Sequence, residues 1–184
     1  MEGAIEAGRQ VAAFLAKMVK GQVHLIFFDT SPRYIEATGK TYEYLRAATQ
    51  TIRADGGTSI GCGLLYARDR KLDFQGIAII SDGEENQLPT FATVYHQHVE
   101  REQTMVPVYF YKIHRTPAQD HAMRLQYGSR MVDAAETLTL NMTTLGHDLQ
   151  RFDLPAEIDY YALPNLIAMG AADADVTGLF TSLS

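Results

Sequence analysis

Three apolar runs of strand length constrain what this 184-residue chain can fold into more than any other feature. They span Val23–Phe28, Gly76–Ile80 and Val106–Ile113. The first run does not alternate between apolar and polar residues, which is typical of a strand covered on both faces. The runs therefore predict strands of a parallel sheet that lies in the middle layer of a fold.

Helical patterns lie between these runs. Glu2–Met18 is rich in alanine and places Val11, Phe14, Leu15 and Met18 on one face. Thr41 is a candidate N-cap before the apolar stripe Tyr44, Leu45, Ala48 and Ile52. Further helices are expected over 60–70 and 90–102, and a short edge strand over 34–36. Helices alternating with buried strands predict a three-layer α/β fold, with a mainly parallel central sheet flanked by helices.

The last third of the chain carries weaker patterns. We expect a helix over 118–127, a strand or a helix end over 137–142, and an extended segment over 148–154. Residues 1–154 are therefore predicted to form one α/β domain. Residues 155–184 are expected to be a tail that packs on this domain, with a frayed end.

Composition excludes several classes of protein. Hydrophobic residues make up 46% and charged residues 21%, so a disordered chain is not expected. No apolar run reaches the roughly 18 residues that cross a bilayer, and the first twenty residues do not form a secretory signal. The formal net charge is -6, and no clustered basic face for nucleic acid is present. The single cysteine, Cys62, is compatible with a reducing compartment, so we expect a cytoplasmic protein.

Polar loops follow the predicted strands at the edge where α/β folds bind ligands. Asp29-Thr30-Ser31 follows the first strand, and Ser81-Asp82-Gly83 follows the second. Gly56-Gly57-Thr58 lies in a loop that can reach the same edge. These three loops are the candidate binding site.

The Gly-Gly-Thr loop and the Ser-Asp-Gly strand end resemble two of the three motifs of the von Willebrand factor A (vWA) domain. In that family the motifs form a metal-ion-dependent adhesion site, in which oxygen ligands hold Mg²⁺ for a partner's carboxylate. The resemblance implies that Thr58 and Asp82 are the metal residues. It places Asp29, Ser31, Gly57 and Gly83 on the rim of the site.

The third motif of the family, Asp-x-Ser-x-Ser, has no good counterpart. The nearest match, which starts at Asp29, ends in Arg33, a cation that opposes Mg²⁺. By the spacing of the family, Asp29 ends the second strand rather than the first. The resemblance thus implies that the usual first central strand is missing, and that this chain binds Mg²⁺ weakly or not at all.

The sequences of two segments, Ala54-Asp55-Gly56-Gly57-Thr58 and Ile79 to Asn86, are most similar to those in A domains of TROVE/Ro-type ribonucleoprotein proteins. In those proteins a separate helical-repeat domain binds RNA. The resemblance does not include that domain, so it does not imply that this chain binds RNA. A missing central strand also opens two sheet edges. The expected partners are therefore another protein, a polypeptide segment that supplies a strand, or a second copy of this chain.

Each candidate residue also has an ordinary structural interpretation. Thr58 or Ser59 can cap the helix that begins near Ile60, and Asp82 can stabilise a turn. Asp29 and Ser31 can likewise form a turn after the first strand. Glu84 and Glu85 can be the solvated start of a helix, and Cys62 can be a small packing residue.

Three functions remain open at this point. The first is a non-enzymatic vWA-type module that binds a protein partner through a partial metal site. The second is a Mg²⁺-dependent phosphatase or hydrolase that uses Asp29 or Asp82, because carboxylate attack on phosphorus needs a metal ion. The third is a scaffold domain whose exposed sheet edge recruits another strand.

Overall fold

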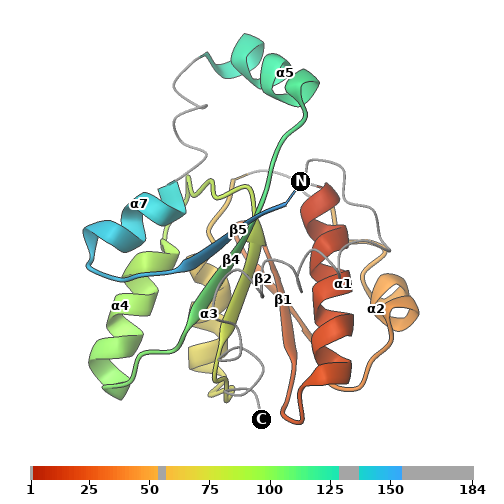
Figure 1. Cartoon of the computed structure of the whole chain (residues 1–184), viewed down its shortest axis with the longest axis vertical. Coiled ribbons are helices and arrows are strands. Elements are labelled where there is room, and N and C mark those ends of the chain that lie inside the picture. The colour runs from red at the N-terminus through yellow and green to blue at the C-terminus, as the bar shows by residue number, and fades with distance from the viewer. Residues whose placement is uncertain (1, 54–56, 129–136, 155–184) are drawn as a thin grey trace.

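The structure is a computed structural model that describes residues 2–53, 57–128 and 137–154 (Figure 1). Its elements are α1 (Glu2–Met18), β1 (His24–Phe28), β2 (Pro32–Glu36), α2 (Tyr42–Ala48), α3 (Gly61–Asp69), β3 (Ile77–Ser81), α4 (Phe91–Glu102), β4 (Val108–Ile113), α5 (Pro117–Tyr127), α7 (Thr137–Thr144) and β5 (Gln150–Leu154). The predicted tail and Ala54-Asp55-Gly56 lie outside the described residues. None of the helices described has both the length and the apolarity that a membrane span requires.

The predicted elements are present, and most differ from prediction only at their ends. Thr41 caps α2 as expected, because its side chain accepts a hydrogen bond from the Tyr44 amide. The stripe on this helix is only partly an inward face, since Leu45 is fully buried while Tyr44 is 51% exposed. The open choice at 137–142 resolves to a helix, α7.

The five strands found in the described residues form two sheets. Strands β3, β4 and β5 make a parallel sheet, in which Ile79 pairs with Phe110 and Phe110 pairs with Arg151. Strands β1 and β2 make a separate antiparallel sheet, in which Ile26 pairs with Tyr34. A parallel sheet flanked by helices is thus confirmed, and the separate antiparallel pair is an addition to what the strand runs predict.

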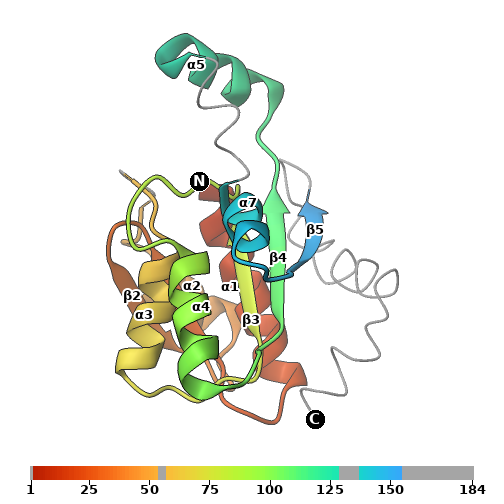
Figure 2. The same ribbon diagram turned by 90° about the vertical axis from the view of Figure 1, so that its left-hand side faces the viewer.

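The same helices cover the two faces of both sheets. In β3, Ile79 packs with the α3–α4 cluster, whereas its neighbour Ile80 packs against α1. In β1, Phe28 likewise packs with the α3–α4 cluster, and Phe27 packs with the cluster that includes α1. The sheets therefore lie in one layer between helices. In Figure 2, β2 and β5 lie at its opposite ends, with β3 and β4 between them.

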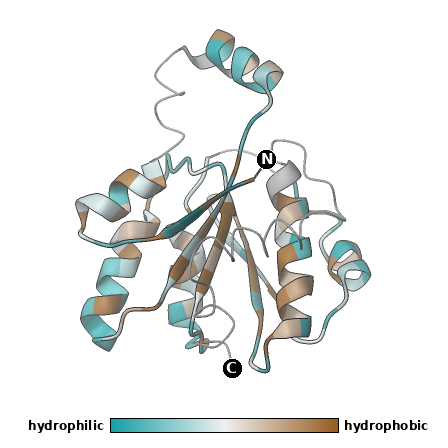
Figure 3. Ribbon diagram, viewed as in Figure 1, coloured by the Kyte–Doolittle hydropathy of each residue, from teal (hydrophilic) through white to brown (hydrophobic). Residues whose placement is uncertain are grey.

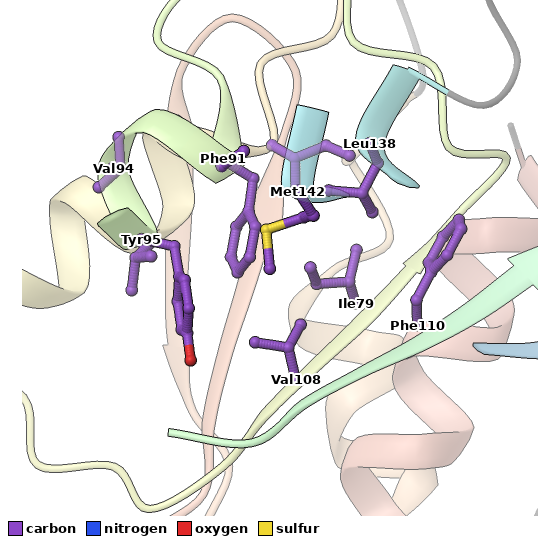
Figure 4. Close-up of a cluster of buried hydrophobic side chains, with 11 residues drawn as sticks. Ile79, Phe91, Val94, Tyr95, Val108, Phe110, Leu138 and Met142 are labelled. Atoms are coloured by element: carbon purple, nitrogen blue, oxygen red, sulfur yellow. The ribbon is translucent and has the colours of Figure 1, made fainter. Parts of the chain in front are cut away.

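The main core lies between the parallel sheet and the helices α3, α4 and α7. Figure 4 shows how Met142 and Leu138 of α7 point toward Phe91 and Ile79. Phe110, Leu138 and Met142 have no exposed surface. Apolar residues concentrate on the strands and the inward sides of the helices, as Figure 3 shows. This core holds the carboxyl ends of β3 and β4 in place.

Helix α1 joins the two sheets from the opposite face. Ala7 and Val11 pack against Tyr111 and Ile113 of β4, while Ala12 and Ala13 pack with residues of β1. Leu15 packs against both clusters. One helix therefore covers strands of both sheets.

Candidate functional site

The loops singled out from the sequence meet at the carboxyl ends of the strands. The Ser59 amide donates to the Asp29 carbonyl at 2.7 Å, which joins the loop before α3 to the end of β1. The Thr58 amide donates to Asn86 Oδ1 at 2.7 Å, and the Thr58 carbonyl accepts from the Asn86 amide at 3.1 Å. The loop before α3 is thus fixed to the ends of both sheets. We call this edge the rim; it comprises Asp29, Ser31, Gly57, Thr58, Asp82, Gly83, Glu84, Asn86 and Arg115.

Asp82 is held in the rim by an arginine. Arg115 Nη2 lies 2.6 Å from Asp82 Oδ2 and 2.9 Å from Glu84 Oε2. The side chains of Asp82, Glu84 and Arg115 are 13%, 8% and 17% exposed, so the triad is shielded from solvent. Burial acts to lower the pKa of Arg115, but the two carboxylates outweigh it and raise that pKa, so the guanidinium stays charged. Asp82 Oδ1 also accepts from the Glu84 amide, which confirms its predicted turn role.

Thr58 is buried, yet its hydroxyl makes no hydrogen bond to any other residue that the structure describes. The helix cap belongs to Ser59 instead, because Ser59 Oγ accepts from the Cys62 amide at 3.2 Å. Ser59 Oγ also donates to the Pro89 carbonyl at 2.7 Å. Of the two capping residues predicted, Ser59 is therefore the one that caps α3. Cys62 is buried, as a packing residue should be.

Two glycines of the rim differ in how strictly the geometry requires them. A Cβ at Gly57 would lie 2.5 Å from Gln87 Cγ, so the exposed Gln87 side chain would have to move aside. Gly83 has a φ of 85°, a conformation that favours glycine. Both belong to the rim as defined above.

Asp29 and Ser31 form the turn predicted after β1. Asp29 Oδ1 accepts from the Ser31 amide at 2.7 Å and from Ser31 Oγ at 3.2 Å. Arg33 Nη2 lies 3.2 Å from Asp29 Oδ2. Burial acts to raise the pKa of Asp29, but these hydrogen bonds and the charge of Arg33 together lower it. Asp29 is therefore an ionised carboxylate with an arginine partner.

Glu84 and Glu85 differ from the prediction of a solvated helix start. As whole residues they are 6% and 8% exposed, and neither lies in a helix. Glu85 Oε1 accepts from the Phe91 amide at 2.7 Å, at the N-terminus of α4, and the Glu85 amide donates to Thr137 Oγ1 at 2.6 Å. The prediction was wrong because these residues lie under α7, which the local sequence does not show.

Arg115 is the first of two rim residues that the sequence did not identify. It follows β4 by two positions, and the same strand-end rule that selects Asp29 and Asp82 would have selected it. Asn86 is the second such residue, since its side chain links Thr58 to Glu84.

The rim does not fit a Mg²⁺ site as it is arranged. Within the described ranges, no group of three or more His, Cys, Asp or Glu residues is placed to hold a metal ion. More directly, the Arg115 guanidinium already bonds both Asp82 and Glu84. A divalent cation at these oxygens would face a fixed positive charge at hydrogen-bond distance.

Comparisons with known proteins give no family. The chain matches no family model, and no curated protein matches it. Among solved structures, a crystal structure described as an uncharacterized membrane spanning protein from Vibrio fischeri is 19% identical to the chain, with a TM-score of 0.28. That match covers 90% of this chain and 83% of the other. A TM-score this low carries no argument about fold or function.

Proposed function

We propose that this chain is a non-enzymatic protein-interaction module of the vWA type, which recognises its partner at the rim. The observation that carries the proposal is the convergence of Asp29, Thr58 and Asp82 at one edge, where Glu84 and Asn86 link Asp82 to Thr58. Open α/β sheets bind their ligands at this edge. The exposed Ser31 and Asn86 give a partner polar groups to contact.

The finer fold assignment is part of the same proposal. A vWA-type layer that lacks its first central strand is supported by the division of the strands between two sheets within one layer. The amino-acid sequences of the two rim loops further support the proposal that this chain is part of a TROVE/Ro-like protein. A cytoplasmic location is proposed because Cys62 is a buried, free thiol.

Partner recognition at the rim is testable by substitution. Ser31→Trp adds bulk at the exposed rim, while Met105→Trp, at the exposed amino end of β4, is the matched control. The wild-type chain and the control should retain the same bound protein from a cell extract, and Ser31→Trp should lose it. Equal retention by all three variants would contradict a rim interface.

We further propose that Mg²⁺ binds this chain weakly or not at all, because Arg115 neutralises the available carboxylates. Isothermal titration with Mg²⁺ and Mn²⁺ should show no tight site in the wild-type chain. Arg115→Gln should bind Mn²⁺ at least about tenfold more tightly, since a competing charge is removed. The double variant Arg115→Gln/Asp82→Asn should lose that gain. A tight stoichiometric site in the wild-type chain would refute this part.

The alternative, a Mg²⁺-dependent phosphatase or hydrolase, requires a carboxylate that is free to attack. Asp29 and Asp82 each have one oxygen paired with an arginine and the other engaged in a turn. This arrangement favours the interaction module. Generic phosphoester assays check it, and activity that is lost in Asp29→Asn or Asp82→Asn would establish the enzyme instead.

A further inference from the structure

Within the described residues, the layer of strands contains two sheet edges that pair with no strand. There, β1 pairs only with β2, and β3 pairs only with β4, on one of its sides. Helix α1 contacts both β1 and β3, so these are the inner strands of the layer. Among the described residues no backbone hydrogen bond joins β1 to β3. Two open edges therefore lie inside a helix-covered layer.

The register identifies the backbone groups on these edges. The Ala37 amide donates to the Val23 carbonyl, so Leu25 and Phe27 turn their backbone groups toward β2. His24, Ile26 and Phe28 consequently turn theirs away from β2.

The same reasoning applies to β3. The Ile77 amide donates to the Pro107 carbonyl, so Ile77, Ile79 and Ser81 bond to β4, whereas Ala78 and Ile80 turn away from it. We call the backbone groups of His24, Ile26 and Phe28, together with those of Ala78 and Ile80, the inner edges.

Exposure of the inner strands agrees with an unfilled position. Strand β4, which has a neighbour on each side, has five of its six residues buried. In β1 only Leu25 is buried, and in β3 Ala78 is exposed while Ile77 and Ile80 are half-buried. Apolar side chains at the centre of a helix-covered layer should be the most buried, and these are not.

We propose that the inner edges bind an apolar β-strand of about five residues from another polypeptide, which runs parallel to β1 and β3. Unpaired strand edges are templates for strand addition, in which main-chain hydrogen bonds provide the affinity. A strand covered on both faces must be apolar throughout, and strands buried in this way are typically parallel. The five-residue length follows from β1 and β3, which span five residues each.

The surroundings support an apolar occupant. On one face the strand would contact α3, where Gly63 lies beside Ile26 and Phe28. On the other face it would contact α1 near Leu15 and Ile80. None of these five residues is charged. The inference goes beyond the rim function and does not depend on Thr58 or Asp82.

Amide hydrogen exchange of the full chain, measured by NMR, tests the proposal. The probe is a synthetic peptide with five alternating valines and isoleucines between paired lysines. In the free chain the amides of Ile26, Phe28, Ala78 and Ile80 should exchange fast, and those of Leu25 and Ile79 slowly. The peptide should slow the fast set by about tenfold or more, on both edges together. The same peptide, N-methylated at every second residue of its run, should have no effect.

A pair of variants tests the same edge from the side of the protein. Ala78→Pro removes an amide that points away from β4, so the ladder to β4 should survive but peptide protection should be lost. Ala78→Val keeps the amide and should retain binding, and Arg115→Gln should leave binding unchanged. If Ala78→Pro unfolds the chain, the N-methylated peptide still decides the matter.

Three outcomes would overturn the proposal. One is slow exchange on both inner edges in the free monomer, which would mean that the chain fills the position with its own residues. Another is slow exchange that appears only with a dimer mass in light scattering, which would make a second copy the occupant. The third is protection by the N-methylated peptide, which would exclude strand pairing.

Discussion

Glu85 is an acid that the fold buries at the start of a helix. Its Oε1 accepts from the Phe91 amide, one of the unpaired donors at the N-terminus of α4. Burial raises the pKa of Glu85 above its ordinary value of 4.5, although the hydrogen bond from Phe91 works against this. The folded chain therefore holds the proton to higher pH than the unfolded chain does. Its contribution to stability is full below pH 4.5 and declines as pH rises through the raised pKa.

Substitution of Glu85 should separate its charge from its hydrogen bond. Glu85→Gln keeps an acceptor for Phe91 and removes the titration. Its unfolding free energy should therefore increase relative to that of the wild type as pH rises above 4.5. Glu85→Ala loses the acceptor and should cost about 1–3 kcal/mol below pH 4.5, and this cost should shrink as pH rises through the raised pKa of Glu85. Urea unfolding of the three proteins between pH 4 and 8 measures both effects. A constant difference between Glu85→Gln and the wild type across this range would show that Glu85 does not titrate there.

Single residues of the site were predictable where their role is local. Asp29, Ser59 and Asp82 stabilise turns or a cap within a few positions of themselves, and sequence spacing identifies such roles. Arg115 acts across 33 positions on Asp82. His96 Nδ1 lies 3.0 Å from His147 Nε2, a pair separated by 51 positions. Contacts of this kind depend on the tertiary fold, and one sequence does not encode them visibly.

At the scale of elements, α3 and α4 pack so closely that one glycine is indispensable. A Cβ at Gly61 would lie 2.5 Å from the Pro89 and Thr90 carbonyl oxygens, which are backbone atoms and cannot turn aside. A Cβ at Gly63, on the same helix, would lie 3.5 Å from Ile26 Cγ2, an ordinary contact. The two glycines therefore have different roles.

Gly61→Ala and Gly63→Ala form a matched pair. Gly61→Ala should destabilise the chain by about 2 kcal/mol or more, because the helices must separate. Gly63→Ala should be neutral or should stabilise by up to about 1 kcal/mol, since alanine favours a helix more than glycine does. Thermal unfolding by circular dichroism measures both, and equal effects would contradict the close approach.

Helix α5 stands apart from the other elements. It projects from the body in both views (Figures 1 and 2), and its described side chains are exposed except for the half-buried Asp120. A capping box at its start, formed by Thr116 and Gln119, is its evident local support. An eleven-residue helix without packing is marginal in water.

Thr116→Ala should therefore melt α5 locally and leave the rest of the chain intact. Losing the cap costs about 1 kcal/mol, which is enough to unfold a marginal helix. Amide exchange should speed up over 117–127, while the midpoint of global urea unfolding stays the same. A shift of that midpoint would mean that α5 is part of the cooperative core.

At the scale of the whole molecule, α1 makes the two sheets one cooperative unit. Leu15 packs against both the β4–β5 cluster and the β1–β2 cluster. Leu15→Ala should cost about 2 kcal/mol and should weaken both sheets together. The amides of Leu25 and Phe110 should then lose exchange protection by the same factor. Loss confined to one of these strands would show that the sheets unfold independently.

The layer order of the fold was predictable, and the division of its sheet was not visible in the strand runs alone. Non-alternating runs such as Val23–Phe28 and Gly76–Ile80 identify buried strands, because both faces must be apolar. Which strands share hydrogen bonds depends on backbone pairing across long sequence separations, and no side-chain pattern records it. The secondary structure of the C-terminal part was harder to predict because Thr137–Thr144 is short and rich in threonine. Its helical state depends on burial of Leu138 and Met142.

The position of α5 also limits the shape of whatever approaches the rim. The helix begins two residues after Arg115 and extends about 16 Å from there. In both views it lies beyond the carboxyl ends of the strands, with its axis running across them rather than along them. A broad, flat molecular surface would contact α5 before it reached Asp82. A narrow protrusion, or a concave surface that straddles α5, could reach the rim without obstruction.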